Sequence, residues 1–317
     1  MLFRSAIHNA MRVIYPRRDE DAGDFVLAMR KYIQRGILAR ESGYGVDEEY
    51  QILNYAFLVT NRSKVVGKEV TDVVIFDTTA KVTRYEFVLG IFTAVDAEYR
   101  TRWLASVLLL DETEASFARA FRDFTSAFGD VILLMTDEDK AIEGAVRRTD
   151  RIHEHGVCGW HVAQNLRRHV LPRLSAGKKE TLIKDFFLVA RCGDEDTFEK
   201  IASEFTSKYT PPSENNTPGP VVRYFRCLMK RSVKWGAIYF SQKNILTLGI
   251  ESTQRGELMN RIIKRNSHPA FPLEKLLARI IELQDEEGKK CQRVENLYNA
   301  QSHLVASQRN SSLKQKL

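Results

Sequence analysis

The chain has 317 residues, of which 44% are hydrophobic and 28% charged, and its formal net charge is +7. Because this length exceeds that of an ordinary single domain, we expect one large domain with an insertion, or two domains. The sequence contains no apolar run of roughly 18 residues and no secretory signal at its amino end, which argues against a membrane span and favours a cytosolic or nuclear protein.

The first part of the chain, residues 1–65, is predicted to be helical. Residues 25–39 carry apolar side chains at the spacing of one helix face. Residues 51–59 are apolar and fit either a helix end or a strand, and their periodicity does not distinguish the two.

From residue 70 the pattern changes to that of a sheet. Short apolar runs at 72–79, 86–96 and 102–111 predict three strands joined by short turns. A helix is predicted from the N-cap Thr113 to Gly129, with phenylalanines on one face, and another strand over 131–137. A helix over 140–148 completes an α/β layout with a mixed sheet.

After about residue 160 the strand signal fades and helical patterns dominate. Helices are predicted over 161–174 and 179–192, followed by a proline-rich loop at 210–220. Helical patterning resumes at Val221, and residues 273–300 form a long amphipathic pattern before a polar tail.

Basic residues are concentrated near the carboxyl end of the chain. Residues 221–265 contain ten Lys or Arg and only two acids, so this segment alone carries +8. Such a concentration is expected of a protein that binds a polyanion such as DNA, although a solvated helix face would give the same pattern.

Two acids follow predicted core strands, Asp77 after the first and Asp137 after the fourth. Sites in α/β proteins form where strands end, and carboxylates there suit hard cations. Two such strands side by side could hold two Mg²⁺ ions about 4 Å apart for phosphoryl transfer. The alternative is that both residues only form turns or cap helices.

Five motifs occur in a fixed order along the chain. They are D-T-T at 77–79, L-L-x-D-E-T-x-x-S-F at 108–117, T-D-x-D-x-A-I at 136–142, C-x-x-H at 158–161 and T-Q-R-x-E-x-x-N at 253–260. In combination, over residues 50 to 265, they resemble the transposase domain of Mutator-like elements (MULE). That family also includes plant transcription factors descended from such transposases.

The resemblance implies an α/β, ribonuclease H-like fold whose first and fourth strands are neighbours. It also implies a helical insertion before the last catalytic helix. The domain limits expected on this basis are an N-terminal helical region at 1–65, the first part of the core at 66–165, the insertion at 166–245, closing core helices at 246–300 and a polar tail at 301–317.

The resemblance also implies a catalytic site. Asp77, Asp137 and Glu257 would be the three acids (DDE) that bind Mg²⁺ or Mn²⁺. Asp139 matches the same motif, but we expect it to cap the helix over 140–148. Cys158 and His161 would hold the insertion near the site by packing and hydrogen bonding; a Zn²⁺ site and a direct DNA contact are the alternatives.

The function implied is that of a DDE-type DNA transposase core, which cleaves transposon ends and joins them to target DNA. Its partners would be double-stranded DNA, at terminal inverted repeats and target sites, and further copies of the chain, with no membrane partner. Nuclear localisation follows from the family. The DNA-binding residues expected are Arg231, Lys234, Arg255, Arg261, Lys264 and Arg265.

Two alternatives remain open at this stage. One is a catalytically silent DNA-binding or transcription-regulatory protein derived from a MULE transposase; the other is an unrelated ribonuclease H-like nuclease. The zinc-binding modules that many family members carry at either end have no counterpart among the cysteines of this sequence. We therefore expect a catalytic core whose targeting parts are removed, degenerate or supplied by another polypeptide.

Three aromatic residues, Trp160, Trp235 and Tyr239, lie in or beside the expected insertion, near basic residues. Core packing is the commoner fate of such side chains, whereas stacking on unpaired bases is the functional alternative.

Overall fold

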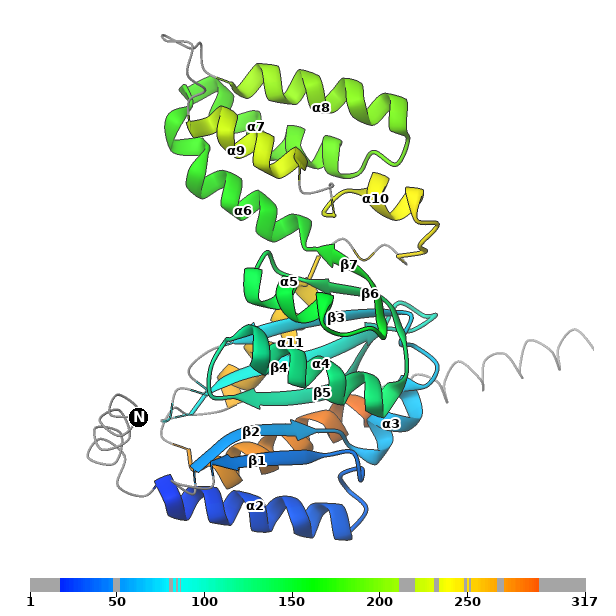
Figure 1. Ribbon diagram of the computed structural model, residues 1–317, viewed down its shortest axis with the longest axis vertical. Coiled ribbons are helices and arrows are strands. Elements are labelled where there is room, and N and C mark those ends of the chain that lie inside the picture. Colours follow the sequence, from blue (N-terminus) through cyan, green and yellow to red (C-terminus); the bar gives the residue numbers. More distant parts are fainter. Residues whose placement is uncertain are drawn as a thin grey trace, which may run out of the picture.

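The computed structural model describes residues 18–47, 52–79, 82–83, 85, 87–210, 220–230, 234–247, 250, 252–266 and 271–290. Within them, a mixed sheet of seven strands forms the body of the molecule, in the order β1-β2-β5-β4-β3-β6-β7 (Figure 1). The strands are β1 (Gly43–Asp47), β2 (Ile52–Leu58), β3 (Val73–Thr79), β4 (Val88–Val95), β5 (Thr101–Leu109), β6 (Val131–Thr136) and β7 (Ile152–Val157). The pairs β3–β6 and β6–β7 are parallel, and the remaining pairs are antiparallel.

Helices cover both faces of this sheet and build a separate bundle beyond β7 (Figure 1). They are α2 (Arg18–Gln34), α3 (Asn61–Gly67), α4 (Glu114–Phe128), α5 (Lys140–Arg147), α6 (Gly159–His169), the 3-10 turn η1 (Leu171–Arg173), α7 (Ala176–Ala190), α8 (Glu195–Tyr209), α9 (Pro220–Lys230), α10 (Ala237–Gln242), α11 (Gln254–Asn266) and a further helix over 273–290.

One face of the sheet is sealed by α4. Its phenylalanines pack on the rings of Phe76 in β3 and Phe92 in β4, with Phe124 stacked on Phe92 at a centroid distance of 4.3 Å. The predicted cap and end of this helix are confirmed: the Thr113 side chain accepts from the Ser116 backbone N–H, and the helix ends before Gly129. This aromatic layer fixes β3, which carries the first acid of the site.

The opposite face is covered by α2, α11 and the helix over 273–290, which share one hydrophobic cluster with the sheet. The last two of these helices carry few apolar residues outside the buried stripe, as expected of amphipathic helices on a core. Since α11 packs directly on β3, the residues of its first turns lie beside those of the strand.

The helices from α6 to α10 form the end of the molecule away from β1 and β2 (Figure 1). The helices α6 to α9 share a hydrophobic cluster of their own, which includes Phe186, Phe205, Phe225 and Trp235. The helix α10 instead packs Tyr239 and Phe240 against residues of β3 and β6. The segment from β7 into α6 connects this helical bundle, here called the insertion, to the sheet. Its limits, expected at 166–245, stay a prediction.

The α/β class is confirmed, whereas the finer ribonuclease H-like assignment stays an expectation. The predicted helical character of residues 1–65 is wrong for Gly43–Asp47, which form β1. Ile52–Leu58, for which the sequence pattern fits either a helix end or a strand, form β2, and both strands extend the sheet. Residues 52–58 are almost all buried because both faces of β2 are covered, which removes the alternation typical of a strand. The predicted tail and residues 291–300 lie outside the described residues.

No helix among the described residues combines the length and apolar character needed to cross a membrane.

Candidate active site

Asp77 and Asp137 lie at the carboxyl ends of two neighbouring strands of the sheet. Asp77 belongs to β3 and is 8% exposed, and Asp137 directly follows β6. The two strands run parallel in adjacent positions, with Ile75 paired to Met135, so the residues that follow this pair emerge together. The adjacency of the first and fourth predicted strands is thus observed.

Glu257 reaches these strand ends from α11. The helix approaches β3 so closely that a Cβ added to Gly256 would lie 2.8 Å from the Cβ of Asp77. A contact that short is not tolerated between rigid atoms, so only glycine permits this packing. The structure therefore places Asp137 and Glu257 close enough to Asp77 for their charges to affect the pKa of Asp77.

Asn260, one turn after Glu257, binds Asp77 directly. Its side-chain Nδ2 donates to Asp77 Oδ2 at 2.6 Å, and both residues are buried. The sequence motif contained Asn260, but no role was assigned to it. The available signal was the spacing of three residues from Glu257, which places both side chains on one helix face.

Asp139 does not join the acids. Its Oδ1 accepts from the backbone N–H groups of Ala141 and Ile142 at 2.7 and 3.0 Å, which confirms the predicted helix cap of α5.

Cys158 and His161 connect β6, the insertion and α11. The Cys158 backbone N–H donates to the Thr136 carbonyl at 2.8 Å, beside Asp137. The Thr253 backbone N–H donates to Cys158 Sγ at 3.2 Å, and the Thr253 hydroxyl lies 3.4 Å from His161 Nδ1. His161 Nε2 faces Glu257 Oε1 at 3.4 Å. These contacts match the predicted role of holding the insertion near the acids.

Burial dominates the electrostatics of the acids. Burial raises the pKa of Asp77 to about 7, the charges of Glu257 and Asp137 add to this, and the Asn260 hydrogen bond and His161 oppose it. Burial also raises the pKa of Asp137, again against the attraction of His161.

His161 is the cation of the cluster. Burial alone would lower its pKa, but the hydrogen bond to Cys158 and the nearby Cys158, Asp137 and Glu257 charges outweigh burial and raise the pKa to about 9. Burial would raise the pKa of the Cys158 thiol, yet hydrogen bonds from His161 and Thr253 leave it lowered. At neutral pH a protonated imidazole therefore stands among the acids and lessens their mutual repulsion.

The fit of a metal ion to these residues is incomplete. Asp137 Oδ1 and Glu257 Oε1 are buried and accept no hydrogen bond, which would suit a cation. However, no three His, Cys, Asp or Glu side chains of the described residues are placed so that they could hold an ion together. As the side chains stand, neither the expected Mg²⁺ set nor a Zn²⁺ set around Cys158 and His161 is formed.

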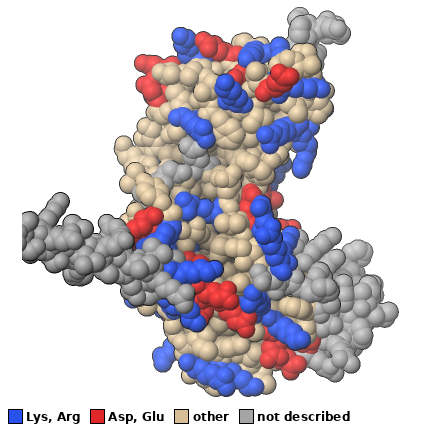
Figure 2. All heavy atoms as spheres, turned by 180° about the vertical axis from the view of Figure 1, so that it is seen from behind, with Lys and Arg blue, Asp and Glu red and all other residues tan. Residues whose placement is uncertain are grey.

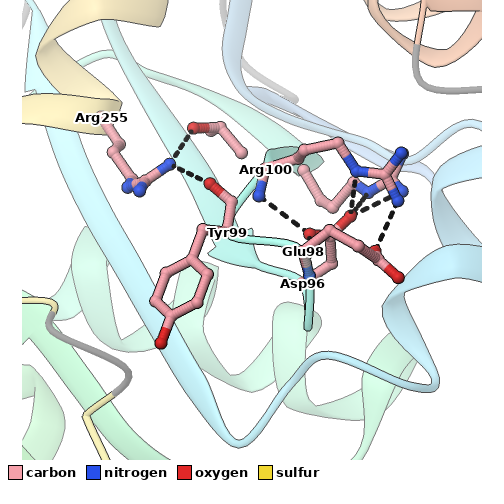
Figure 3. A network of polar contacts seen from close by, with 7 residues as sticks. Asp96, Glu98, Tyr99, Arg100 and Arg255 are labelled. Atoms are coloured by element: carbon pink, nitrogen blue, oxygen red, sulfur yellow. Dashed lines mark hydrogen bonds and ion pairs between the residues drawn. The ribbon is translucent and has the colours of Figure 1, made fainter. Parts of the chain in front are cut away.

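Arg255 is engaged by the protein itself. Its Nη1 donates to the Tyr99 carbonyl at 2.9 Å and to Thr101 Oγ1 at 3.0 Å (Figure 3). Tyr99 lies in the turn between β4 and β5 and has a φ of +59°. Asp96 stabilises this turn, because its carboxylate accepts hydrogen bonds from the backbone N–H and the side chain of Arg100. Arg255 thus ties the start of α11 to this turn, a structural role that the DNA-binding prediction did not include.

The other expected DNA-binding residues differ in their surroundings. Arg261, Lys264 and Arg265 are exposed on α11 and form no ion pair with another described residue. Lys234 is half-buried beside β7, where its carbonyl accepts from the Val157 N–H. Arg231 lies outside the described residues. On the face shown in Figure 2, basic and acidic side chains are interspersed rather than separated.

Comparison with known proteins agrees with the sequence motifs. The family model described as "MULE transposase domain" matches residues 73–165. This segment matches the MULE transposase domain. It runs from β3 into α6 and contains Asp77, Asp137, Cys158 and His161, so the recognition made from the motifs is confirmed. Glu257 lies beyond the matched segment.

The MULE segment and its surroundings are also similar to plant proteins. "Protein FAR1-RELATED SEQUENCE 4" of Arabidopsis thaliana is 24% identical over 237 residues, which are 74% of this chain and 31% of that protein. "Protein FAR-RED IMPAIRED RESPONSE 1" of the same plant is 23% identical over 240 residues, 74% of this chain and 27% of that protein. The chain thus spans about a third or less of the length of these relatives.

Proposed function

We propose that this chain binds double-stranded DNA as a regulatory protein derived from a MULE transposase, without cutting the DNA. The observation that carries this proposal is the state of the acid cluster. Asp77 accepts a hydrogen bond from Asn260, and Glu257 lies 3.4 Å from His161, so two of the three acids are in contact with the protein's own side chains. The name of one plant relative described above, "Protein FAR-RED IMPAIRED RESPONSE 1", refers to a far-red response, and neither name refers to transposition.

The acid cluster then serves the fold. It joins β3, β6, the start of the insertion and α11 through contacts between buried and half-buried groups. A partly protonated Asp77 and a cationic His161 reduce the cost of gathering three carboxyl groups in the interior. Such a cluster positions α11 on the sheet.

DNA would lie against the outer face of α11. Met259 and Ile263 bury the inner face of this helix in the core. Arg261, Lys264 and Arg265 follow at the spacing of one helix face and are exposed. These three cations form no ion pair with another described residue and lie along one face of the helix. They suit the phosphates of a duplex, whose counterions are released on binding. Action on DNA would place the protein in the nucleus.

A variant with Arg261, Lys264 and Arg265 all replaced by Gln should bind duplex DNA more weakly at every salt concentration. Each lost phosphate contact lowers the slope of log affinity against log salt by about 0.9, so the triple variant should lose about 3. Fluorescence anisotropy with a labelled duplex across a salt series measures both quantities.

The matched control replaces Lys179, Lys184 and Lys200 by Gln, which removes the same charge from exposed positions of α7 and α8. Its slope should stay close to that of the wild-type protein. Equal losses in both triple variants would show that net charge, and not the face of α11, drives binding.

The second candidate function is the transposase core itself, with metal-dependent cleavage and strand transfer at transposon ends. Two observations favour it: all three acids are present at one place, and Asp137 Oδ1 and Glu257 Oε1 are buried without a hydrogen-bond donor. Such activity requires the side chains to rearrange around Mg²⁺ or Mn²⁺. Pairing of two DNA ends would also require an assembly of at least two chains.

A nicking assay on supercoiled plasmid with Mg²⁺ or Mn²⁺ separates the two candidates. Under the lead proposal, neither the wild-type chain nor Glu257→Gln nicks the plasmid, although both retard it in a gel. Metal-dependent nicking by the wild type that is lost in Glu257→Gln would overturn the lead proposal and establish the transposase.

A further inference from the structure

A cavity of about 270 Å³ lies between the sheet and the insertion, next to Asp137. Core residues from the end of β6, the start of α5 and β7 form one wall, and the end of α9 with Lys234 and Trp235 forms the other. It is therefore bounded by the two parts of the molecule that the acid cluster joins. Neither candidate function assigns a use to this space.

Two polar atoms of residues that line the cavity have no hydrogen-bond partner. Trp235 is 6% exposed, and its buried indole Nε1 donates to no described group; Asp137 Oδ1 likewise accepts no hydrogen bond. Leaving such buried groups unsatisfied is unfavourable, so a ligand that supplies both an acceptor and a donor would relieve this cost.

The cavity combines apolar and polar walls. Val157, Leu228 and the Trp235 ring supply apolar surface, and the buried His155 adds a ring whose Nε2 lies 2.8 Å from Thr136 Oγ1. A flat molecule with apolar faces and a polar edge matches such walls. Nucleobases have this character, and enzymes and binding proteins hold unpaired bases in pockets of this kind.

The charges that line the cavity favour one orientation of a bound nucleotide, with its phosphates near the insertion and its base inside the cavity. Lys230 and Lys234 stand on the insertion wall, and neither forms an ion pair with a described residue. The opposite wall carries four acids and one lysine, which are Asp137, Glu138, Asp139, Glu143 and Lys140. A phosphate is attracted to the lysines and repelled by the acids, so the backbone would remain on the insertion side while the neutral base enters.

We propose that this cavity binds one unpaired nucleobase of the bound DNA, with Trp235 Nε1 donating to the base and Lys230 and Lys234 contacting the adjacent phosphates. The inference rests on the proposed DNA binding and deepens it by naming the strand feature that is recognised. Trp235 acts through the edge of its indole, because its face is packed against Phe186 at a centroid distance of 5.1 Å.

The test compares three labelled DNAs by anisotropy: a fully paired duplex, the same duplex with a short unpaired thymidine tail, and the same duplex with an abasic tail of equal length. The wild-type chain should prefer the thymidine tail by about fivefold over the abasic tail, the size of one net hydrogen bond. It should bind both tailed DNAs more tightly than the paired duplex, because both offer phosphates to Lys230 and Lys234. Because the abasic tail retains its phosphates, it separates base binding from phosphate attraction.

Trp235→Phe retains an aromatic ring against Phe186 but lacks the N–H group. It should bind the paired duplex as the wild type does and lose the preference for the thymidine tail. Lys230→Gln with Lys234→Gln should weaken binding of both tailed DNAs more than of the paired duplex. Lys243→Gln, an ion-pair partner of Glu154 that does not line the cavity, is the charge control and should change neither.

The outcomes distinguish this inference from the function on which it rests. Binding of paired duplex without a preference for the thymidine tail over the abasic tail would overturn the inference alone, as would a preference that survives in Trp235→Phe. Failure to bind any of the three DNAs would overturn the proposed function and the inference with it. If Trp235→Phe does not fold, as judged by thermal unfolding, the double lysine variant still tests the inference. A preference for the tailed DNAs over the paired duplex that is unchanged in this variant overturns the phosphate contacts and with them the proposed mode of binding.

Discussion

At pH 8 and without metal, Asp77→Asn should be more stable to urea than the wild-type protein, by up to about 4 kcal/mol. Folding raises the pKa of Asp77 from 3.8 to about 7, mainly by burial, so the folded chain binds this proton more tightly than the unfolded chain. The contribution of Asp77 to the stability of the wild-type protein therefore falls as the pH rises from about 4 to 7. Asparagine avoids the buried charge, and its carbonyl can still accept from Asn260.

The gain from Asp77→Asn should disappear at pH 4, where the aspartate is protonated in the folded state. Urea unfolding at pH 4, 6 and 8 in a chelating buffer measures this dependence. Asp150→Asn, at an exposed position after α5, removes the same formal charge without burial and should show no comparable gain. An Asp77→Asn variant that is no more stable than wild type at pH 8 would contradict the view that Asp77 is held at a cost.

The central part of the fold could be predicted from the sequence because its strands are covered on both faces. Val73–Thr79 and Val131–Thr136 are short apolar runs, and they form the adjacent parallel strands β3 and β6. The phenylalanine stripe of α4 was equally clear, since all its members point to one face. Local pattern and final environment agree in these elements.

The edge of the sheet beyond β6 could not be predicted in the same way. The strand Ile152–Val157 reads IHEHGV, with two histidines and a glutamate among its six residues. It becomes a strand because β6 offers a free parallel edge and because His155 finds a partner in Thr136. Pairing partners distant in sequence decide such elements, and a single-sequence pattern does not contain them.

The same limit applies to the site. The position of Asp77 and Asp137 at strand ends follows from local pattern, but Glu257 was identified only through the family motif. Nothing in its own helix separates it from a surface glutamate. The roles of Asn260 and Arg255 depend on where α11 packs on the sheet, and tertiary contacts rather than local sequence decide that position. Gly256 is the one local sign that this helix approaches another element closely.

Gly256→Ala should therefore have the largest effect of any small substitution in α11. An added methyl group would stand 2.8 Å from Asp77 Cβ and 3.7 Å from Ile75 Cγ2, and neither the strand backbone nor a Cβ can turn away. The helix must shift outward, at a cost of about 1–3 kcal/mol in the free energy of unfolding. The shift also moves Glu257 and Asn260 away from Asp77.

This displacement predicts two measurable changes together. Urea unfolding should show the loss of stability. The loss of stability that Asp77 causes between pH 4 and 7 should also be smaller than in the wild-type protein, because Asp77 becomes more hydrated. Gly177→Ala, in the first turn of α7 with no atom within 4 Å of the added Cβ, is the matched control. It should gain about 0.5–1 kcal/mol, since alanine favours a helix over glycine. If Gly256→Ala gained stability as the control does, α11 would not be seated against β3 as described, and the gathering of the three acids would lose its structural basis.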